Sequence, residues 1–239
     1  MSYHNNPRIV TDSLVLCLDA NAKRSYPGSG TTWFDLTPNA QNGTINGATH
    51  NSAGYFDFDG TDDVVGPNTF DYDDSGGAFT VCAWLNPDTF TSSNNYLAII
   101  NRTDNSNHIF SVFIESSSGS GTTGEMAAWF FDTGGTIRQH KSNGNCVLNL
   151  NEWNFCVWRF ADLDGYTFDL NNSDGSVSYN APSAYSIRKD STSQFTIGRW
   201  RSAVYYFDGE MGCINVYSKK LSDSEVSQMY NTSRSRFGL

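Results

Sequence analysis

The stretch that decides the fold is FTVCAWLNP, at residues 79–87. Successive side chains of a β-strand point to opposite sides, so alternate residues from Val81 to Leu85 face one side and those from Thr80 to Trp84 face the other. Both sides carry apolar or bulky groups, which is typical of a strand that is covered on both faces. The stretch therefore predicts a strand at the centre of a layered β structure.

A second stretch of this kind, EWNFCVWRF at residues 152–160, also alternates between two occupied faces. Around these two, apolar or alternating segments of strand length recur between turns rich in Gly, Asn, Asp and Ser. The further predicted strands are Leu14–Leu18, Tyr55–Phe58, Val64–Val65, Leu97–Ile100, Ile109–Ile114, Glu125–Phe131, Tyr166–Leu170, Phe195–Gly198, Tyr205–Phe207 and Gly212–Tyr217. So many short strands exceed what one open sheet usually holds. They predict an all-β fold, a two-sheet antiparallel jelly-roll sandwich.

One short C-terminal helix is predicted as well. Ser222 and Glu225 have the spacing of a capping box, in which each side chain bonds the backbone of the other residue. Val226, Met229 and Tyr230 then fall on one face at helical spacing. We expect this helix to pack against the edge of the sandwich.

The sequence gives no sign of an internal boundary. No linker rich in Pro, Gly or Ser divides it, so we predict a single domain over residues 12–239. The polar residues 1–11 precede the first strand, cannot fold alone, and suit an N-terminal docking arm.

Composition excludes several classes of protein. The 239 residues carry 25 acidic and 15 basic side chains, a formal net charge of −10. Of the acids 20 are Asp and only five are Glu, which excludes a mostly helical protein because Asp favours turns and Glu favours helix surfaces. No basic block is present to neutralise phosphates, so we expect no nucleic acid as a partner.

The N-terminus, MSYHNNPRIV, lacks the apolar core of a signal peptide, and no run approaches the roughly 18 apolar residues that span a bilayer. We therefore expect synthesis in the cytoplasm and no membrane insertion. Four of the five cysteines lie in apolar strand-like runs, and none forms a CxxC pair. We therefore favour reduced thiols in the core. A disulfide remains an alternative, and a zinc site is disfavoured.

Six segments together resemble the laminin-G-like jelly-roll family within the concanavalin A-like lectin/glucanase superfamily. In chain order they are TWFDLTPNAQNGTI (32–45), YFDFDGTDDVV (55–65), FTVCAWLNP (79–87), EWNFCVWRF (152–160), FTIGRW (195–200) and YFDGEMGCINVYSKKLSDSEV (206–226). The opening stretch, residues 6–36, is similar to the start of jelly-roll proteins of tailed bacteriophages. That resemblance implies a virion component.

The resemblance also implies where catalysis would lie. The β-glucanases of the superfamily carry a Glu-x-Asp-x-x-Glu run that places two Glu side chains on one strand face, as nucleophile and acid/base. No such run is present, and after the FDG turn the chain reads Glu210-Met211-Gly212-Cys213, without the second acid of the family's usual pair. The five Glu residues are isolated along the sequence, so we predict no enzymatic activity and no catalytic residues.

Calcium is the one cofactor that the sequence offers a place for. Jelly-roll lectins of this kind often hold Ca²⁺ at the rim through carboxylate and carbonyl oxygens. Asp59, Asp62 and Asp63 lie in one tight turn, and DYDD supplies Asp71, Asp73 and Asp74 nearby. Asp also favours solvated turns for its local backbone hydrogen bonds, and this turn interpretation is preferred. We expect no required cofactor, with Asp59, Asp62 and Asp63 as the candidate metal ligands.

Glycan binding would need exposed aromatic rings beside hydrogen-bonding groups. The candidate glycan contacts are Trp33, Trp129 and Trp200. The alternative is that these side chains are buried, as tryptophan usually is in such sandwiches.

The sequence therefore predicts a non-enzymatic virion structural protein, a capsid decoration or appendage component of a tailed bacteriophage. Its partners would be other virion proteins, with a homo-oligomer expected. The alternative is a carbohydrate-binding adhesin that recognises host surface glycans, with or without Ca²⁺.

Overall fold

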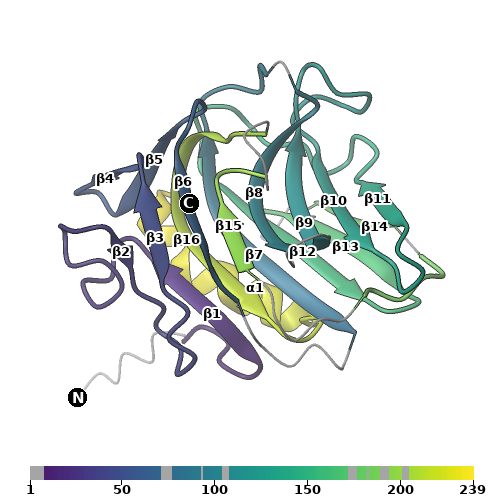
Figure 1. Ribbon diagram of the computed structural model, residues 1–239, viewed down its shortest axis with the longest axis horizontal. Helices are drawn as coiled ribbons and strands as arrows, with labels where there is room; N and C mark the ends of the chain where they lie inside the picture. Colours follow the sequence, from purple (N-terminus) through teal and green to yellow (C-terminus); the bar gives the residue numbers. More distant parts are fainter. Residues whose placement is uncertain are drawn as a thin grey trace.

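The computed structural model describes residues 8–70, 77–92, 94–103, 108–171, 177–181, 183–188, 194–200 and 205–239. They form two antiparallel eight-stranded sheets packed face to face (Figure 1), which confirms the predicted all-β sandwich with one C-terminal helix. The first sheet contains β1 (Leu14–Asp19), β4 (Thr49–Asn51), β5 (Tyr55–Asp59), β7 (Ala78–Pro87), β12 (Asn154–Ala161), β13 (Gly165–Leu170), β14 (Val177–Ala181) and β16 (Asp208–Tyr217). The second contains β2 (Thr32–Trp33), β3 (Gly43–Asn46), β6 (Val64–Thr69), β8 (Tyr96–Thr103), β9 (His108–Glu115), β10 (Met126–Phe131), β11 (Ile137–Lys141) and β15 (Gln194–Ile197).

Strand β16 joins the two ends of the chain within the first sheet. The sheet runs β14-β13-β12-β7-β16-β5-β4, and β1 pairs with the later half of β16. The second sheet runs β11-β10-β9-β8-β15-β6-β3-β2. Consecutive strands therefore alternate between hairpins within one sheet and crossings to the other, which is the jelly-roll pattern.

The core lies between the sheets. In β7 the alternate residues from Val81 to Leu85 are fully buried in it, as the alternation predicted. Phe79 of the first sheet stacks on Phe110 of the second, with ring centroids 4.2 Å apart. Trp158 of β12 donates its indole N–H to the carbonyl of Ala127 on β10, at 3.1 Å. The indole therefore bonds across the core to the facing sheet, so its only polar group is not left unpaired.

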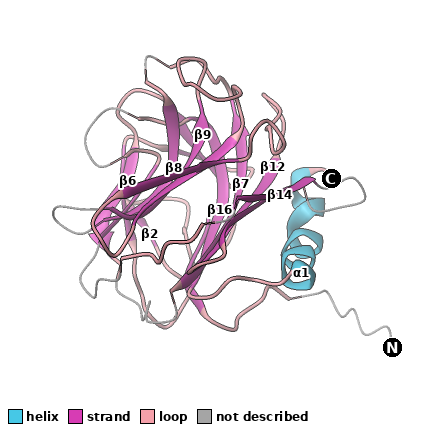
Figure 2. Ribbon diagram, turned by 90° about the vertical axis from the view of Figure 1, so that its right-hand side faces the viewer, coloured by secondary structure: helices cyan, strands magenta, loops and turns pink. Residues whose placement is uncertain are grey.

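The outer face of the first sheet is covered by α1 (Asp223–Ser233) and the short 3₁₀ helix η1 (Arg234–Phe237). Figure 2 shows α1 against the outer side of the sheet that holds β7, β12 and β16. Trp84 of β7 stacks on Phe237 with ring centroids 4.3 Å apart, and its indole N–H donates to Ser233 Oγ at 2.8 Å. Both faces of β7 are thus buried.

The capping box predicts the helix start correctly. Ser222 accepts from the Glu225 amide, and the Glu225 carboxylate accepts from the Ser222 amide. Val226, Met229 and Tyr230 form the buried face.

Several short strands escaped prediction. β2, β3 and β4 have four residues or fewer, and β11 reads IRQHK, which is too polar for an apolar pattern. The fifth strand missed is β14. The predicted strand Tyr205–Phe207 was wrong: Tyr206 makes only an isolated bridge to Arg199.

The N-terminal arm is seen from residue 8, since residues 1–7 lie outside the described residues. Val10 is buried against the helix, and its carbonyl accepts from the hydroxyl of Tyr217 at 3.0 Å. The Arg8 carbonyl accepts from the Gln228 side chain at 2.6 Å. This part of the arm is therefore bound to α1 rather than extended into solvent.

All five cysteines are buried and none is in a disulfide, as favoured from the sequence. Burial raises the pKa of Cys17 to about 12, so its thiol is neutral and behaves as a small apolar group. In the described residues, no helix has the length and apolar character needed to cross a membrane.

A buried ion pair fastens the helix to the first sheet. Arg159 of β12, 5% exposed, bonds both carboxylate oxygens of Asp169 on β13 at 2.7 and 2.8 Å. Its remaining nitrogen donates to the Leu221 carbonyl at 2.9 Å and to Asp223 at 2.7 Å. The burial of a guanidinium costs free energy that only such complete pairing offsets.

We predict that Arg159→Met lowers the free energy of unfolding by about 3–5 kcal/mol, because Asp169 is left buried without its guanidinium. Urea unfolding at pH 7 measures the change. The double variant Arg159→Met/Asp169→Leu should recover most of the loss, since a buried pair replaced by apolar groups is often neutral. A single variant within 1 kcal/mol of the native protein would contradict this role.

Candidate functional site

Carboxylates gather where the start of β16 meets β5 and the end of β7. We call this group the acidic corner: Asp57, Asp59, Asp62, Asp63, Asp88, Asp208 and Glu210. The register of the first sheet produces it, because Asp208 pairs with Asp59 and Glu210 pairs with Asp57. The Asp88 amide also donates to the Asp208 carbonyl, at 3.1 Å.

The turn 59–63 brings the three predicted metal ligands together. One carboxylate oxygen each from Asp59, Asp62 and Asp63 lies within 4.8 Å of the others. That spacing fits a cation bound at 2.3–2.6 Å by each oxygen. Asp63 is buried whereas the other two are exposed. The three residues therefore fit a cation such as Ca²⁺; Asp71, Asp73 and Asp74 lie outside the described residues.

The same carboxylates also hold the turn. Asp59 accepts from the Thr61 amide at 2.8 Å, and Asp63 accepts from the Asp59 amide at 2.9 Å. Gly47 makes room for Asp63, because a Cβ at Gly47 would lie 1.8 Å from the Asp63 carboxylate. The turn interpretation and the metal interpretation thus apply to the same residues. Of the three carboxylates, only that of Asp62 accepts no hydrogen bond within the turn.

Burial and mutual repulsion act on the corner together. Burial raises the pKa of Asp208, and the Asp88, Asp57 and Asp59 carboxylates add to the rise. Burial and Asp88 likewise raise the pKa of Glu210. Among the described residues, no ion pair joins the corner to a Lys or Arg. A bound cation would offset this repulsion.

Sequence reasoning did not connect Asp57, Asp88, Asp208 or Glu210 with the turn 59–63. A signal was available, since Phe-Asp-Gly occurs twice, at residues 58–60 and 207–209. The structure places the two copies side by side as antiparallel partners. Gly209 in particular is required there, because a Cβ would lie 2.3 Å from the Asn86 carbonyl oxygen.

A hairpin leads from the corner to an aromatic cluster. The Gly60 amide donates to the Phe207 carbonyl at 3.1 Å, and the Phe207 amide donates to Gly198 at 2.9 Å. Further along, the Trp200 amide donates to the Tyr205 carbonyl at 3.2 Å. The hairpin carries these two rings over the outer face of the second sheet.

We call that surface the aromatic face: Tyr96, Phe113, Trp129, Trp200 and Tyr205. Trp200 lies edge-on to Trp129 at 5.8 Å and 5.0 Å from Tyr205, measured between ring centroids. Trp129 is 7% exposed, whereas Trp200 and Tyr205 are partly exposed. The face is thus largely sealed, with its accessible edge at the hairpin.

The three candidate tryptophans therefore differ in whether a glycan could reach their rings. Trp33 is fully buried and packs on Phe56 at 4.6 Å, so its assignment as a glycan platform was wrong. Its strand faces the core, where a large ring buries the most apolar area. Trp129 and Trp200 share the aromatic face, and of the two Trp200 offers the more accessible ring.

The glutamates are less isolated than their sequence positions suggested. Glu115 ends β9 and Glu125 precedes β10, and the Glu115 amide donates to the Glu125 carbonyl at 2.8 Å. A Cβ at Gly121 would lie 2.1 Å from an oxygen of Glu125 and 3.1 Å from the carboxyl carbon of Glu115. The two carboxylates are therefore close neighbours, which corrects the expectation of scattered acids.

Both carboxylates accept hydrogen bonds from backbone amides of the loop 116–124. Glu115, fully buried, accepts from the Gly121 amide and pairs with Lys141, both at 2.8 Å. Glu125, 1% exposed, accepts from the Thr122 and Gly144 amides. A retaining pair must reach the sugar, and these two carboxylates lie beneath the loop instead.

Comparison with known proteins gives a fold-level relationship. Residues 58–227 match a laminin G model described as the concanavalin A-like lectin/glucanases superfamily. No curated protein matches the chain in sequence.

Two solved structures illustrate the likeness. Trypanosoma rangeli sialidase in complex with the inhibitor DANA superposes with a TM-score of 0.63 at 13% identity, over 93% of this chain and 33% of the sialidase. The binding domain of botulinum neurotoxin DC in complex with SialylT superposes with a TM-score of 0.62 at 14% identity, over 93% of this chain and 52% of that chain. The chain thus spans about a third of the sialidase and half of the toxin chain, and the likeness is one of fold.

We predict that Asp208→Asn raises the melting temperature by about 1–3 °C at pH 7 in EDTA, because one repelling charge is removed from the corner. The folded-state pKa of Asp208 lies above its ordinary value, so ionisation destabilises the fold as pH rises. The gain should therefore vanish below the ordinary carboxyl pKa, where both states are protonated.

Glu152→Gln is the matched control, because Glu152 is exposed and outside the corner. It should leave the melting temperature unchanged at either pH. A loss of stability in Asp208→Asn at pH 7 would show that the corner is not under repulsion.

Proposed function

The chain belongs to the concanavalin A-like lectin/glucanases superfamily, and from this premise we propose that it is a non-catalytic component of a tailed-bacteriophage virion whose exposed corner binds carbohydrate. The proposal joins two roles on one rigid sandwich. Protein contacts hold the domain on the particle, and the corner recognises glycans of the host surface.

The continuity of the acidic corner with the hairpin carries the proposal of glycan binding. Gly60 and Phe207 are hydrogen-bonded at the corner, and Trp200 lies two residues beyond Gly198 on the same hairpin. Two residues span at most about 7 Å. A sugar presents hydroxyl oxygens that a cation binds and an apolar face that packs on an aromatic ring. Asp59, Asp62 and Asp63 would hold the cation, and Trp200 would meet the sugar ring.

The placement of the glutamates supports binding rather than hydrolysis. Glu115 and Glu125 are a close Glu–Glu pair in the described residues, and both are buried beneath the loop that they anchor. Hydrolysis with retention needs two carboxyl groups that flank the bond to be cut. We therefore propose that the domain has no glycosidase activity.

Residues 6–36 support the place on a virion, because they resemble the start of tailed-bacteriophage jelly-roll proteins. In the structure residues 8–36 contain β1 and β2, and Asp35 accepts a hydrogen bond from the Cys17 amide at 2.9 Å. The net charge of −10 suits docking on a basic surface of another virion protein. We propose such proteins, and further copies of this chain, as partners.

For glycan binding we predict selective signals on a glycan array in 1 mM Ca²⁺ that fall at least 10-fold in EDTA. Asp62→Asn should cause the same loss, because it removes the negative charge of one cation ligand and no hydrogen bond of the turn. Trp200→Ala should also weaken binding about 10-fold.

The control is Tyr185→Ala, since Tyr185 is an exposed ring on a different part of the surface, stacked over Arg138. This variant should bind as the native protein does. Binding that ignores EDTA and both site variants would place recognition elsewhere on the domain.

For the virion role we predict that mass spectrometry of purified particles detects this chain at a fixed copy number relative to the major capsid protein. Cross-linking of intact particles should join it to a virion protein or to its own copies. Its absence from particles that are otherwise complete would refute the virion role and leave the glycan proposal standing.

A further inference from the structure

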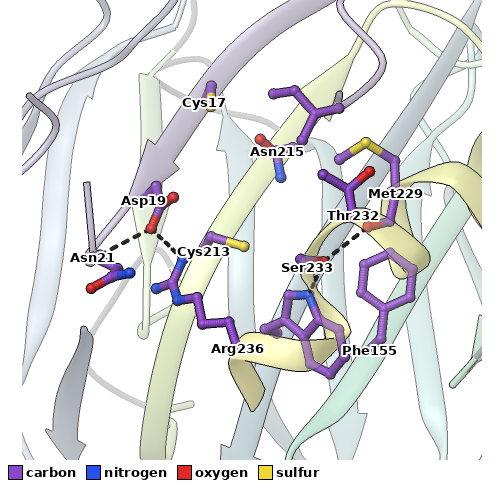
Figure 3. A pocket seen from close by; sticks show the side chains of 12 residues that line it. Cys17, Asp19, Asn21, Phe155, Cys213, Asn215, Met229, Thr232, Ser233 and Arg236 are labelled. Carbon is purple, nitrogen blue, oxygen red and sulfur yellow. Dashed lines mark hydrogen bonds and ion pairs between the residues drawn. The ribbon is translucent and has the colours of Figure 1, made fainter. Parts of the chain in front are cut away.

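A pocket of about 260 Å³ lies between the outer face of the first sheet and α1 (Figure 3). Cys17, Cys213 and Asn215 line it from the sheet, and Met229 and Thr232 line it from the helix. The aromatic face covers the outer side of the other sheet. The pocket is therefore on the opposite side of the sandwich from that face.

The register of β1 and β16 fixes the sheet side of the pocket. Cys17 pairs with Asn215 and Asp19 pairs with Cys213, so all four side chains project from the same outer face. Burial raises the pKa of both thiols above the ordinary value. At neutral pH they are uncharged and serve as small apolar lining groups.

Asn215 is the unusual member of this lining. Only 5% of its surface is exposed, yet its side chain makes no hydrogen bond to any described residue. Figure 3 shows its amide between the strands and the helix, facing the pocket. The amide atoms are not sealed in the core but open to the pocket, so the pocket offers a ligand one hydrogen-bond donor and one acceptor.

Most of the other buried polar groups of the pocket are paired, although Arg236 Nε is left without a partner among the described residues. Asp19 forms an ion pair with Arg236 at 2.6 Å, at one end of the pocket. Ser233 accepts from Trp84 and donates to the Met229 carbonyl. The Asp19 and Arg236 charges therefore offset each other, and the accessible apolar wall is formed by Ile9 and the two thiols.

We propose that this pocket binds a small uncharged molecule made of one apolar ring and one amide or carbonyl group. The head group bonds Asn215, and the ring lies against Ile9 and the Cys17 and Cys213 thiols, the apolar lining groups that keep accessible surface. Size agrees with this ligand, since an apolar cavity of about 150 Å³ already admits benzene. A charged ligand is disfavoured, because Asp19 and Arg236 already neutralise each other.

Benzamide, benzene and benzoate are the probes, titrated into the full-length ¹⁵N-labelled protein and followed by amide shifts. Benzamide should bind with a dissociation constant of about 0.1–1 mM, as expected of so small a ligand. The perturbed amides should belong to three segments that meet only at the pocket: residues 17–21, 213–215 and 229–236. Benzoate should bind at least 10-fold more weakly than benzamide.

Asn215→Leu should weaken benzamide binding about 10-fold and leave benzene binding unchanged or stronger, because only the amide contact is lost. Thr232→Tyr places a larger ring at the partly exposed edge of the pocket and should abolish binding of both probes. If one variant fails to fold, the other decides. Equal benzamide affinity in the native protein and a folded variant, or shifts confined to other regions, would overturn the proposal.

Discussion

The central strands β7, β12 and β16 carry apolar side chains on both faces, so the first sheet needs a second cover on its outer side. Strands β8, β9 and β10 likewise give the second sheet an apolar outer face. For the first sheet that cover is α1, whose buried face packs on Trp84 and Tyr217. For the second sheet it is the aromatic face, closed by the hairpin that carries Trp200. Most of the features of functional interest follow from how these two covers are attached.

The helix cover leaves the pocket as a consequence of geometry. A sheet twists steadily along its strands, whereas a helix is nearly straight, so the two cannot remain in contact along their whole length. Contact is tight at Trp84, which stacks on η1, and opens beside Asn215. Arg159 of β12 anchors the start of the same helix to the same outer face of the sheet. The acidic corner arises differently, from two Phe-Asp-Gly turns that pair and bring their carboxylates together against repulsion.

Local patterns in the sequence predicted what depends on neighbouring residues. The alternation around Val81 and Trp84 gave the doubly covered strand, the spacing of Ser222 and Glu225 gave the helix start, and the turn at Asp59 gave three carboxylates close together. What depends on strand order could not be read in this way. Alternation tells which residues share a face but not which face meets the core, so Trp33 was misplaced. Glu115 and Glu125 became neighbours only through the pairing of β9 with β10, although the SSSGSG turn between them marks that hairpin.

The claim on which this account depends most is that the helix is an integral cover of the first sheet rather than an appendage. Native-state hydrogen exchange of the full-length protein at pH 7 tests it most directly. The account predicts that the amides of the buried face of α1 exchange with the same opening free energy as those of β7 and β16, as one cooperative unit. Exchange of α1 at a much lower free energy, with β7 and β16 still protected, would contradict it.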